Sequence, residues 1–128
     1  MRHRMAVLLV VAGVALAVPP LRAHHSFAAE FDGNKPVVLT GSVTKVEWRN
    51  PHIWVYFDVK DASGMVTPWQ CEGSAPNNLT RQGWSRETLK QGQHITVEGW
   101  RAKDGTNTCN AGTWKLPNGQ TVFAGPRQ

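Results

Sequence analysis

Residues 52–60, HIWVYFDVK, alternate between apolar and mixed polar positions, and this pattern limits the fold more than any other. Ile53, Val55, Phe57 and Val59 share one parity. Alternation with a period of two predicts a β-strand with one face on a core. The other parity contains His52, Trp54, Tyr56 and Asp58, so the segment also predicts an aromatic outer face.

The remaining chain is divided into further short strand-like segments. Residues 37–48 change parity along their length, which predicts a bulge, and Gly41 is a favourable place for a sharp bend. Pro68 in a third segment, 65–72, indicates an edge strand. Residues 74–83 predict one short helix, with an early proline and a closing glycine. Asp104-Gly105 and Asn118-Gly119 are hairpin signals around the last strands, predicted at 94–103, 108–116 and 121–123.

This order predicts an all-β domain with one short helix, over residues 37–125. A long bent first strand followed by β-β-α-β-β favours a small five- to six-stranded OB-like barrel. Another small barrel or a sandwich with the same number of strands is the alternative. Residues 24–36 would then be an N-terminal extension of the barrel.

The first 23 residues have the features of a secretory signal peptide. Arg2 and Arg4 precede an apolar run over residues 5–18, two prolines follow, and Leu21-Arg22-Ala23 permits cleavage after Ala23. Cleavage after Ala17 and an uncut membrane anchor are the alternatives. The apolar run is shorter than the roughly 20 residues of a membrane span, so we expect a periplasmic or secreted protein that touches a membrane only if the signal is uncleaved.

Export changes the charge balance. The full chain has 14 basic and 9 acidic residues, a net charge of +5. The signal contains Arg2, Arg4 and Arg22 and no acidic residue, so 14 less 3 leaves 11 basic residues against 9 acidic ones, a net charge of +2. A nucleic-acid partner is therefore disfavoured.

Cys71 and Cys109 are the only two cysteines. An oxidising compartment favours a disulfide between them, which would stabilise the fold by about 4 kcal/mol in the chain-entropy model. Metal ligation is the alternative, but cysteines 38 positions apart lack the close spacing of a metal site.

Four segments spread along the mature chain also carry a resemblance, which extends over nearly all of that chain: AHHSFAAEFD at 23–32, LTGSVTKVEWRNPHIWVYFDVKD at 39–61, RQGWSRETLKQGQHITVEGWRAKDGTN at 81–107 and VFAG at 122–125. The combination of HHSF with NPH resembles a family of small exported bacterial proteins of unknown function. The resemblance implies an exported β-barrel domain and no activity. The cysteines lie outside these motifs, so the disulfide is predicted from this chain alone.

Cleavage after Ala23 would make His24 the N-terminal residue. Its α-amine and imidazole could chelate one metal ion together, with His25 or His52 as a further nitrogen ligand. Such a set suits Cu(II), the one cofactor that the sequence suggests. The alternative is that His24 and His25 are only a polar terminus, and that His52 is an ordinary surface residue.

His52, Trp54 and Tyr56 are the candidate ligand-binding residues, because OB-type barrels bind ligands on the outer face of strands 2 and 3. Burial of this face under a second layer is the alternative. A sugar, peptide or other small ligand is favoured over nucleic acid, because Asp58 lies on the same face.

No catalytic residue is predicted. The serines lack a recognisable nucleophile motif, and Glu72 and Glu98 are expected to be ordinary carboxylates on solvent-facing strand positions. The leading hypothesis is therefore an exported binding module that is not an enzyme. The alternatives are a copper protein, as carrier or small oxidative enzyme, and a structural envelope protein that binds partners through an exposed strand edge.

Overall fold

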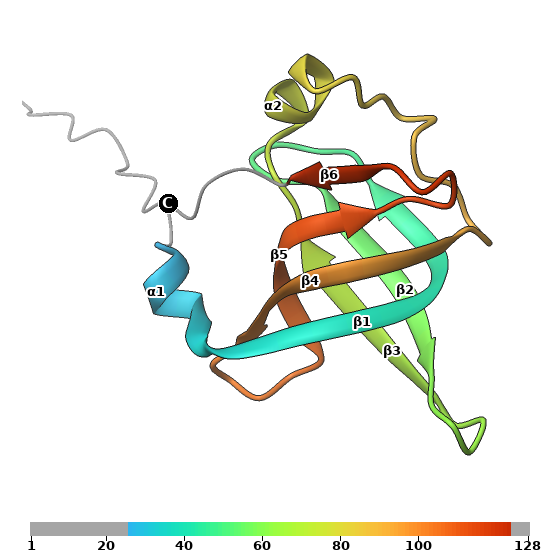
Figure 1. Cartoon of the computed structure of the whole chain (residues 1–128). Helices are drawn as coiled ribbons and strands as arrows, with labels where there is room; N and C mark the ends of the chain where they lie inside the picture. The colour runs from blue at the N-terminus through green and yellow to red at the C-terminus, as the bar shows by residue number, and fades with distance from the viewer. Residues whose placement is uncertain (1–25, 124–128) are drawn as a thin grey trace, which may run out of the picture.

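The computed structural model describes residues 26–123 (Figure 1). The predicted signal peptide, His24, His25 and residues 124–128 lie outside the described residues. Two short helices and six strands make up the described chain: α1 (Phe27–Glu30), β1 (Phe31–Glu47), β2 (Trp54–Lys60), β3 (Val66–Glu72), α2 (Pro76–Arg81), β4 (His94–Ala102), β5 (Thr108–Lys115) and β6 (Thr121–Phe123).

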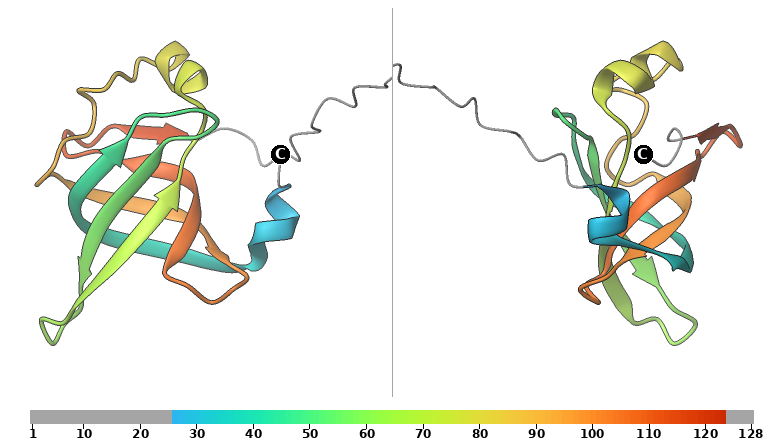
Figure 2. Two further views of the ribbon diagram at one scale, coloured as in Figure 1. Left: turned by 180° about the vertical axis from the view of Figure 1, so that it is seen from behind. Right: turned by 90° about the vertical axis from the view of Figure 1, so that its left-hand side faces the viewer.

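The strands close into a ring. Their order is β3-β2-β1-β4-β5-β6, and an additional parallel pairing of β3 with β5 joins the two sides. The ring therefore runs β1-β2-β3-β5-β4, with β6 added beside β5 and α2 between β3 and β4 in the chain (Figures 1 and 2). The predicted small all-β barrel is confirmed.

The long first strand is bent and serves both sides of the barrel. Its early residues pair with β4 and its later residues with β2, while Gly41 pairs with both. A β-carbon at Gly41 would lie 2.3 Å from the carbonyl oxygen of Asp58, so only glycine fits between the strands. The predicted bulge is present, and it lies between Val43 and Lys45. The extra residue there explains the change of parity.

The core fills the inside of the ring. Ile53, Val55 and Phe57 are almost completely buried, as the alternation predicts, and Val59 is partly buried. Trp114 is the largest fully buried side chain. The remaining strands of the ring and the segment around α2 supply the rest of the core, including Val43, Cys71, Leu79, Trp84, Leu89, Ile95, Val97 and Cys109.

Helix α1 has no counterpart among the elements that the sequence predicts. It lies outside the ring next to the start of β1, and β1 itself begins at Phe31, six residues before the predicted strand (Figure 1). The Phe27 ring stacks on Phe31 at 5.8 Å and meets Trp100 edge-on at 5.6 Å. The Lys103 ammonium also donates to the carbonyl of Ala28. These contacts attach α1 to the start of β1, to Trp100 of β4 and to Lys103 directly after β4.

The described residues include no helix that is long and apolar enough to cross a membrane.

Candidate functional site

The structure places His52 against Glu72. His52 lies in the loop before β2, and Glu72 is the last residue of β3. The Ile53 amide donates to the carbonyl of Ser74 at 3.1 Å, and the Gly73 amide donates to the carbonyl of Ile53 at 2.9 Å. These bonds fix the loop to the end of β3, so that His52 Nδ1 pairs with Glu72 Oε1.

Glu72 is buried, with 7% of its surface exposed. The expectation of an ordinary solvent-facing carboxylate is therefore wrong. The reason is topological: the end of β3 pairs with β2 on one side, and with β5 on the other, where Glu72 lies opposite Asn110. A carboxylate flanked by strands on both sides has much less access to water than one at an open sheet edge.

Burial raises the pKa of the Glu72 carboxyl, because removal from water disfavours its charged form. The nearby charge of Glu30 in α1 raises this pKa further, whereas the charge of His52 and a hydrogen bond from Asn110 lower it. Glu72 is thus a buried acid with a raised pKa, on which neighbouring groups have opposing effects. Perturbed pKa values of this kind are enriched at functional sites.

Glu72 also sets the orientation of the His52 ring. When Nδ1 donates its proton to the carboxylate, the neutral ring keeps its free lone pair on Nε2. The His52 side chain is 40% exposed, so the pair combines a buried acid with an accessible imidazole. Such a ring can accept a hydrogen bond, take up a proton or bind a metal ion through Nε2.

Trp54 and Tyr56 follow His52 on the outer face of β2, and both are half-buried. Trp54 lies opposite Glu72 on β3 and Glu47 on β1. The Lys45 ammonium is 5.3 Å from the centre of the Tyr56 ring. The structure therefore brings together His52, Trp54 and Tyr56 on one face, which is neither fully open nor covered by a second layer.

The cations beside this face are paired. Glu47 Oε1 accepts from the Lys45 ammonium at 2.5 Å, while Glu47 Oε2 accepts from Arg49 Nε at 3.1 Å and lies 3.5 Å from the Tyr56 hydroxyl. The Lys45 hydrogen bond lowers the pKa of Glu47, so Glu47 stays ionised and holds both cations. The face thus presents aromatic surface and an imidazole, and the adjacent cluster of Lys45, Arg49 and Glu47 has a net charge of +1 because one carboxylate serves two cations.

The described residues contain no group of three or more His, Cys, Asp or Glu side chains that could hold a metal ion. His52 is the only predicted metal ligand among the described residues, and His24 and His25 lie outside them. A metal set built on His52 would need ligands from that N-terminal segment.

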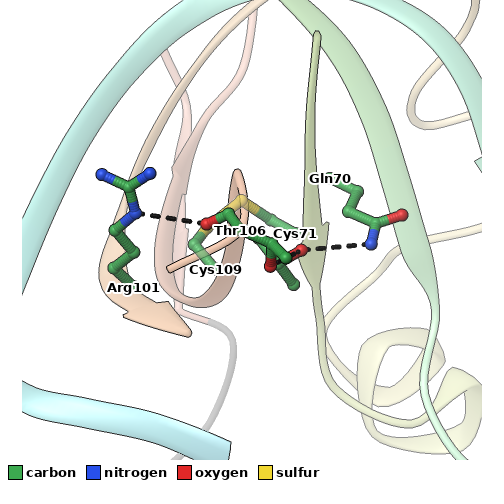
Figure 3. The surroundings of a disulfide bond; sticks show 6 residues. Gln70, Cys71, Arg101, Thr106 and Cys109 are labelled. Carbon is green, nitrogen blue, oxygen red and sulfur yellow. Dashed lines mark hydrogen bonds between the residues drawn. A yellow bond between two sulfur atoms is a disulfide. The ribbon is translucent and has the colours of Figure 1, made fainter. Parts of the chain in front are cut away.

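A disulfide joins Cys71 to Cys109 next to the site (Figure 3). The two cysteines are paired in register between β3 and β5, with their Cα atoms 4.5 Å apart. On the same strands, the Gln70 amide donates to the Thr108 hydroxyl at 3.1 Å. The bridge and this bond hold β3 and β5 together one residue away from Glu72 and Asn110.

Glu72 should make the protein less stable as the pH rises. The folded state raises the pKa of Glu72 above its ordinary value of 4.5, so the stabilising contribution is fully present below pH 4.5 and is lost as the pH rises through the folded-state pKa. The substitution Glu72→Gln removes this titration. Urea unfolding between about pH 4 and pH 8 should show the variant gaining free energy of unfolding relative to the wild type as the pH rises.

Glu87→Gln is the matched control with the opposite sign. Glu87 is exposed, and the Lys90 ammonium lowers its pKa through a hydrogen bond. Its contribution is present at high pH and is lost as the pH falls, so this variant should lose a little stability relative to the wild type as the pH rises. A flat difference between Glu72→Gln and the wild type would contradict the burial of an ionisable Glu72.

Residues 10–111 match the family of unknown function DUF6152. The chain belongs to this family. The matched range includes strands β1 to β4, helix α2 and both cysteines of the disulfide. It therefore contains His52, Trp54 and Tyr56. A comparison with curated proteins gave no match.

One solved structure is similar to this DUF6152 chain: the ZRD-deleted mutant of TiaS in complex with agmatine. The TM-score is 0.51 and the sequence identity 18%, and the match covers 75% of this chain but 28% of that protein. At this identity the likeness concerns the fold alone.

The structure shows which parts of the site the sequence could reveal. Period-two alternation predicts His52, Trp54 and Tyr56 on one face; the structure has Trp54 and Tyr56 on the outer face of β2, and His52 in the loop before it, against the Glu72 that lies opposite Trp54. The sequence did not indicate that Glu72, Asn110 and Glu30 belong to the site. Each of them lies there because of strand pairing or a contact between segments that are far apart in the sequence. The position of Glu72 directly after a predicted disulfide cysteine was the one available signal.

Proposed function

We propose that this protein is an exported OB-like barrel that binds a ligand on its outer face at His52, Trp54 and Tyr56. The observation that carries the proposal is the pairing of accessible His52 with buried Glu72 beside the half-buried indole of Trp54. A buried carboxylate that orients an exposed polar group has a cost in stability, and it is typical of a surface adapted for recognition.

The chemistry of this face favours a small neutral or weakly polar ligand. Trp54 and Tyr56 offer aromatic surface for stacking, and His52 Nε2 offers a hydrogen bond. Nucleic acid is disfavoured, because Glu47 offsets one of the two neighbouring cations, Lys45 and Arg49, and Asp58 adds a further negative charge to the same face. A sugar, a peptide or a small molecule fits better, and no step of bond making or breaking is required.

A ligand screen tests this function. Arrays of glycans and peptides identify a binder, and calorimetry with the full mature chain measures its affinity. Trp54→Ala and His52→Ala should each weaken binding at least tenfold, or about 1.4 kcal/mol. Trp69→Phe is the matched control, because Trp69 pairs with Phe57 outside the binding face. Affinity that is unchanged in both site variants would refute the proposed site.

A second candidate function is copper binding through an N-terminal His24. One observation favours it: a carboxylate on Nδ1 is the usual support of a metal-binding histidine, and Glu72 gives His52 this support. The described chain begins at Ser26, directly before α1, and Glu30 of α1 is close enough for its charge to act on Glu72. His24 would supply its amine and ring, with His52 or His25 as the third nitrogen.

Copper binding requires a specific terminus, so its test has two parts. N-terminal sequencing of protein recovered from the periplasm should begin at His24. Competition with a chromogenic chelator should then show Cu(II) binding that is at least tenfold weaker in His24→Ala, and unchanged in the control His94→Ala. Another terminus, or equal copper affinity in His24→Ala, would exclude the copper function and leave the ligand-binding face untouched.

A further inference from the structure

A separate cleft of about 290 Å³ lies beside the residues that follow the C-terminal end of α2. It is formed where the chain between α2 and β4 passes beside the β5–β6 hairpin (Figure 1). Amide and hydroxyl side chains and one indole dominate its lining: Gln82, Trp84, Thr88, Gln93, Asn118 and Gln120. None of the residues that line it is an Asp, Glu, Lys, Arg or His, and none belongs to the face around His52.

The hydrogen bonds of these side chains leave mainly donors free for a ligand. The carbonyl oxygens of Gln93 and Asn118 already accept backbone amides at 2.8 and 2.9 Å. Their NH₂ groups remain as donors. Gln82 and Gln120 make no side-chain hydrogen bond to any described residue, so both offer a donor and an acceptor.

The floor of the cleft is apolar and anchored to the core. Trp84 and Leu116 are 4% and 8% exposed. The Trp84 ring packs edge-on against the fully buried Trp114 at 6.2 Å. The polar rim therefore lies above residues that are packed into the core. Positive φ angles at Gly83 and Gly119 allow the turns that bring the two sides of the rim together.

We infer that this cleft binds one neutral sugar residue. A sugar ring combines many hydroxyl oxygens with an apolar face, which matches an uncharged amide rim above an indole and a leucine. The absence of cations among the lining residues disfavours phosphorylated or carboxylated ligands. The volume is at the lower end of ligand pockets, and it suits a single ring rather than a chain.

The probes are the methyl glycosides of glucose, galactose, mannose and N-acetylglucosamine, titrated into the full mature chain and followed by two-dimensional amide NMR. We expect saturable shifts at the cleft with a Kd on the order of 1 mM for at least one glycoside, because a single ring offers few contacts. A glycan array then separates a free sugar from the terminal residue of a glycan as its source.

Gln82→Ala and Gln120→Ala should each weaken this binding about tenfold. Gln91→Ala is the matched control, because Gln91 is an exposed glutamine of a nearby turn that does not line the cleft. Trp54→Ala should leave the sugar affinity unchanged, which separates this site from the proposed outer-face site. Three outcomes would overturn the inference. They are no saturable binding of any glycoside, a sugar affinity in both cleft variants equal to that of the wild type, or binding of an unglycosylated peptide in the cleft instead.

Discussion

Replacing Cys71 and Cys109 together with alanine should lower the free energy of unfolding by about 4 kcal/mol. The bridge closes a loop between cysteines that are 38 positions apart, and its loss returns this conformational freedom to the unfolded chain. Alanine is the appropriate replacement because both cysteines are completely buried. Serine would bury a hydroxyl group at each position and so lower the stability for a second reason. Urea unfolding followed by tryptophan fluorescence measures the change.

The reduced wild-type protein is the control for this experiment. It should lose a similar amount of stability, whereas the oxidised wild type should have a mass two hydrogens below that of the dithiol. A dithiol mass in protein purified from the periplasm would refute the bridge. A double variant as stable as the oxidised wild type would show that the bridge contributes nothing to folding.

Trp114→Ala should lower the free energy of unfolding by about 3–5 kcal/mol, the usual range for loss of a large buried aromatic side chain. Trp114 has no exposed surface and packs against Trp84, which attaches the segment after α2 to the barrel. Its indole nitrogen makes no hydrogen bond to any described residue, so Trp114→Phe removes volume without breaking a bond. We therefore expect a smaller loss for phenylalanine than for alanine.

Denaturant unfolding of both Trp114 variants provides the measurement, with Met65→Ala as the surface control. Met65 is 66% exposed, so its replacement should change stability by less than about 0.5 kcal/mol. If Trp114→Ala were no more destabilising than Met65→Ala, the packing of the core around this indole would be refuted.

Local patterns were sufficient to predict most of the barrel. The alternation of Ile53, Val55 and Phe57 depends only on the geometry of a strand, and these side chains are in the core. The hairpin signals also act locally, and Gly105 and Gly119 have the positive φ angles that such turns require. The change of parity in β1 predicted a bulge for the same reason, although its position depends on how β1 is shared between two partner strands.

Contacts between distant segments could not be predicted in this way. The parallel pairing of β3 with β5 has no signature in either strand, yet it buries Glu72 and places Asn110 beside it. Helix α1 has only four residues and depends on Phe27 meeting Trp100. Only part of the candidate site could thus be predicted. The alternation of side chains along β2 predicts its outer-face residues, whereas the burial of Glu72 depends on the pairing of β3 with β5.

The disulfide has a second consequence, for the position of Glu72 relative to His52. The register between β3 and β5 rests on three residue pairs, and the bridged cysteines are the middle pair. Glu72 and Asn110 are the next pair along. In a reducing solution this register depends on the strand pairing and on the hydrogen bond between Gln70 and Thr108, whereas the bridge adds a covalent restraint that keeps Glu72 beside His52. An environment that can form the bond would therefore favour a fixed position of this acid beneath the proposed binding face.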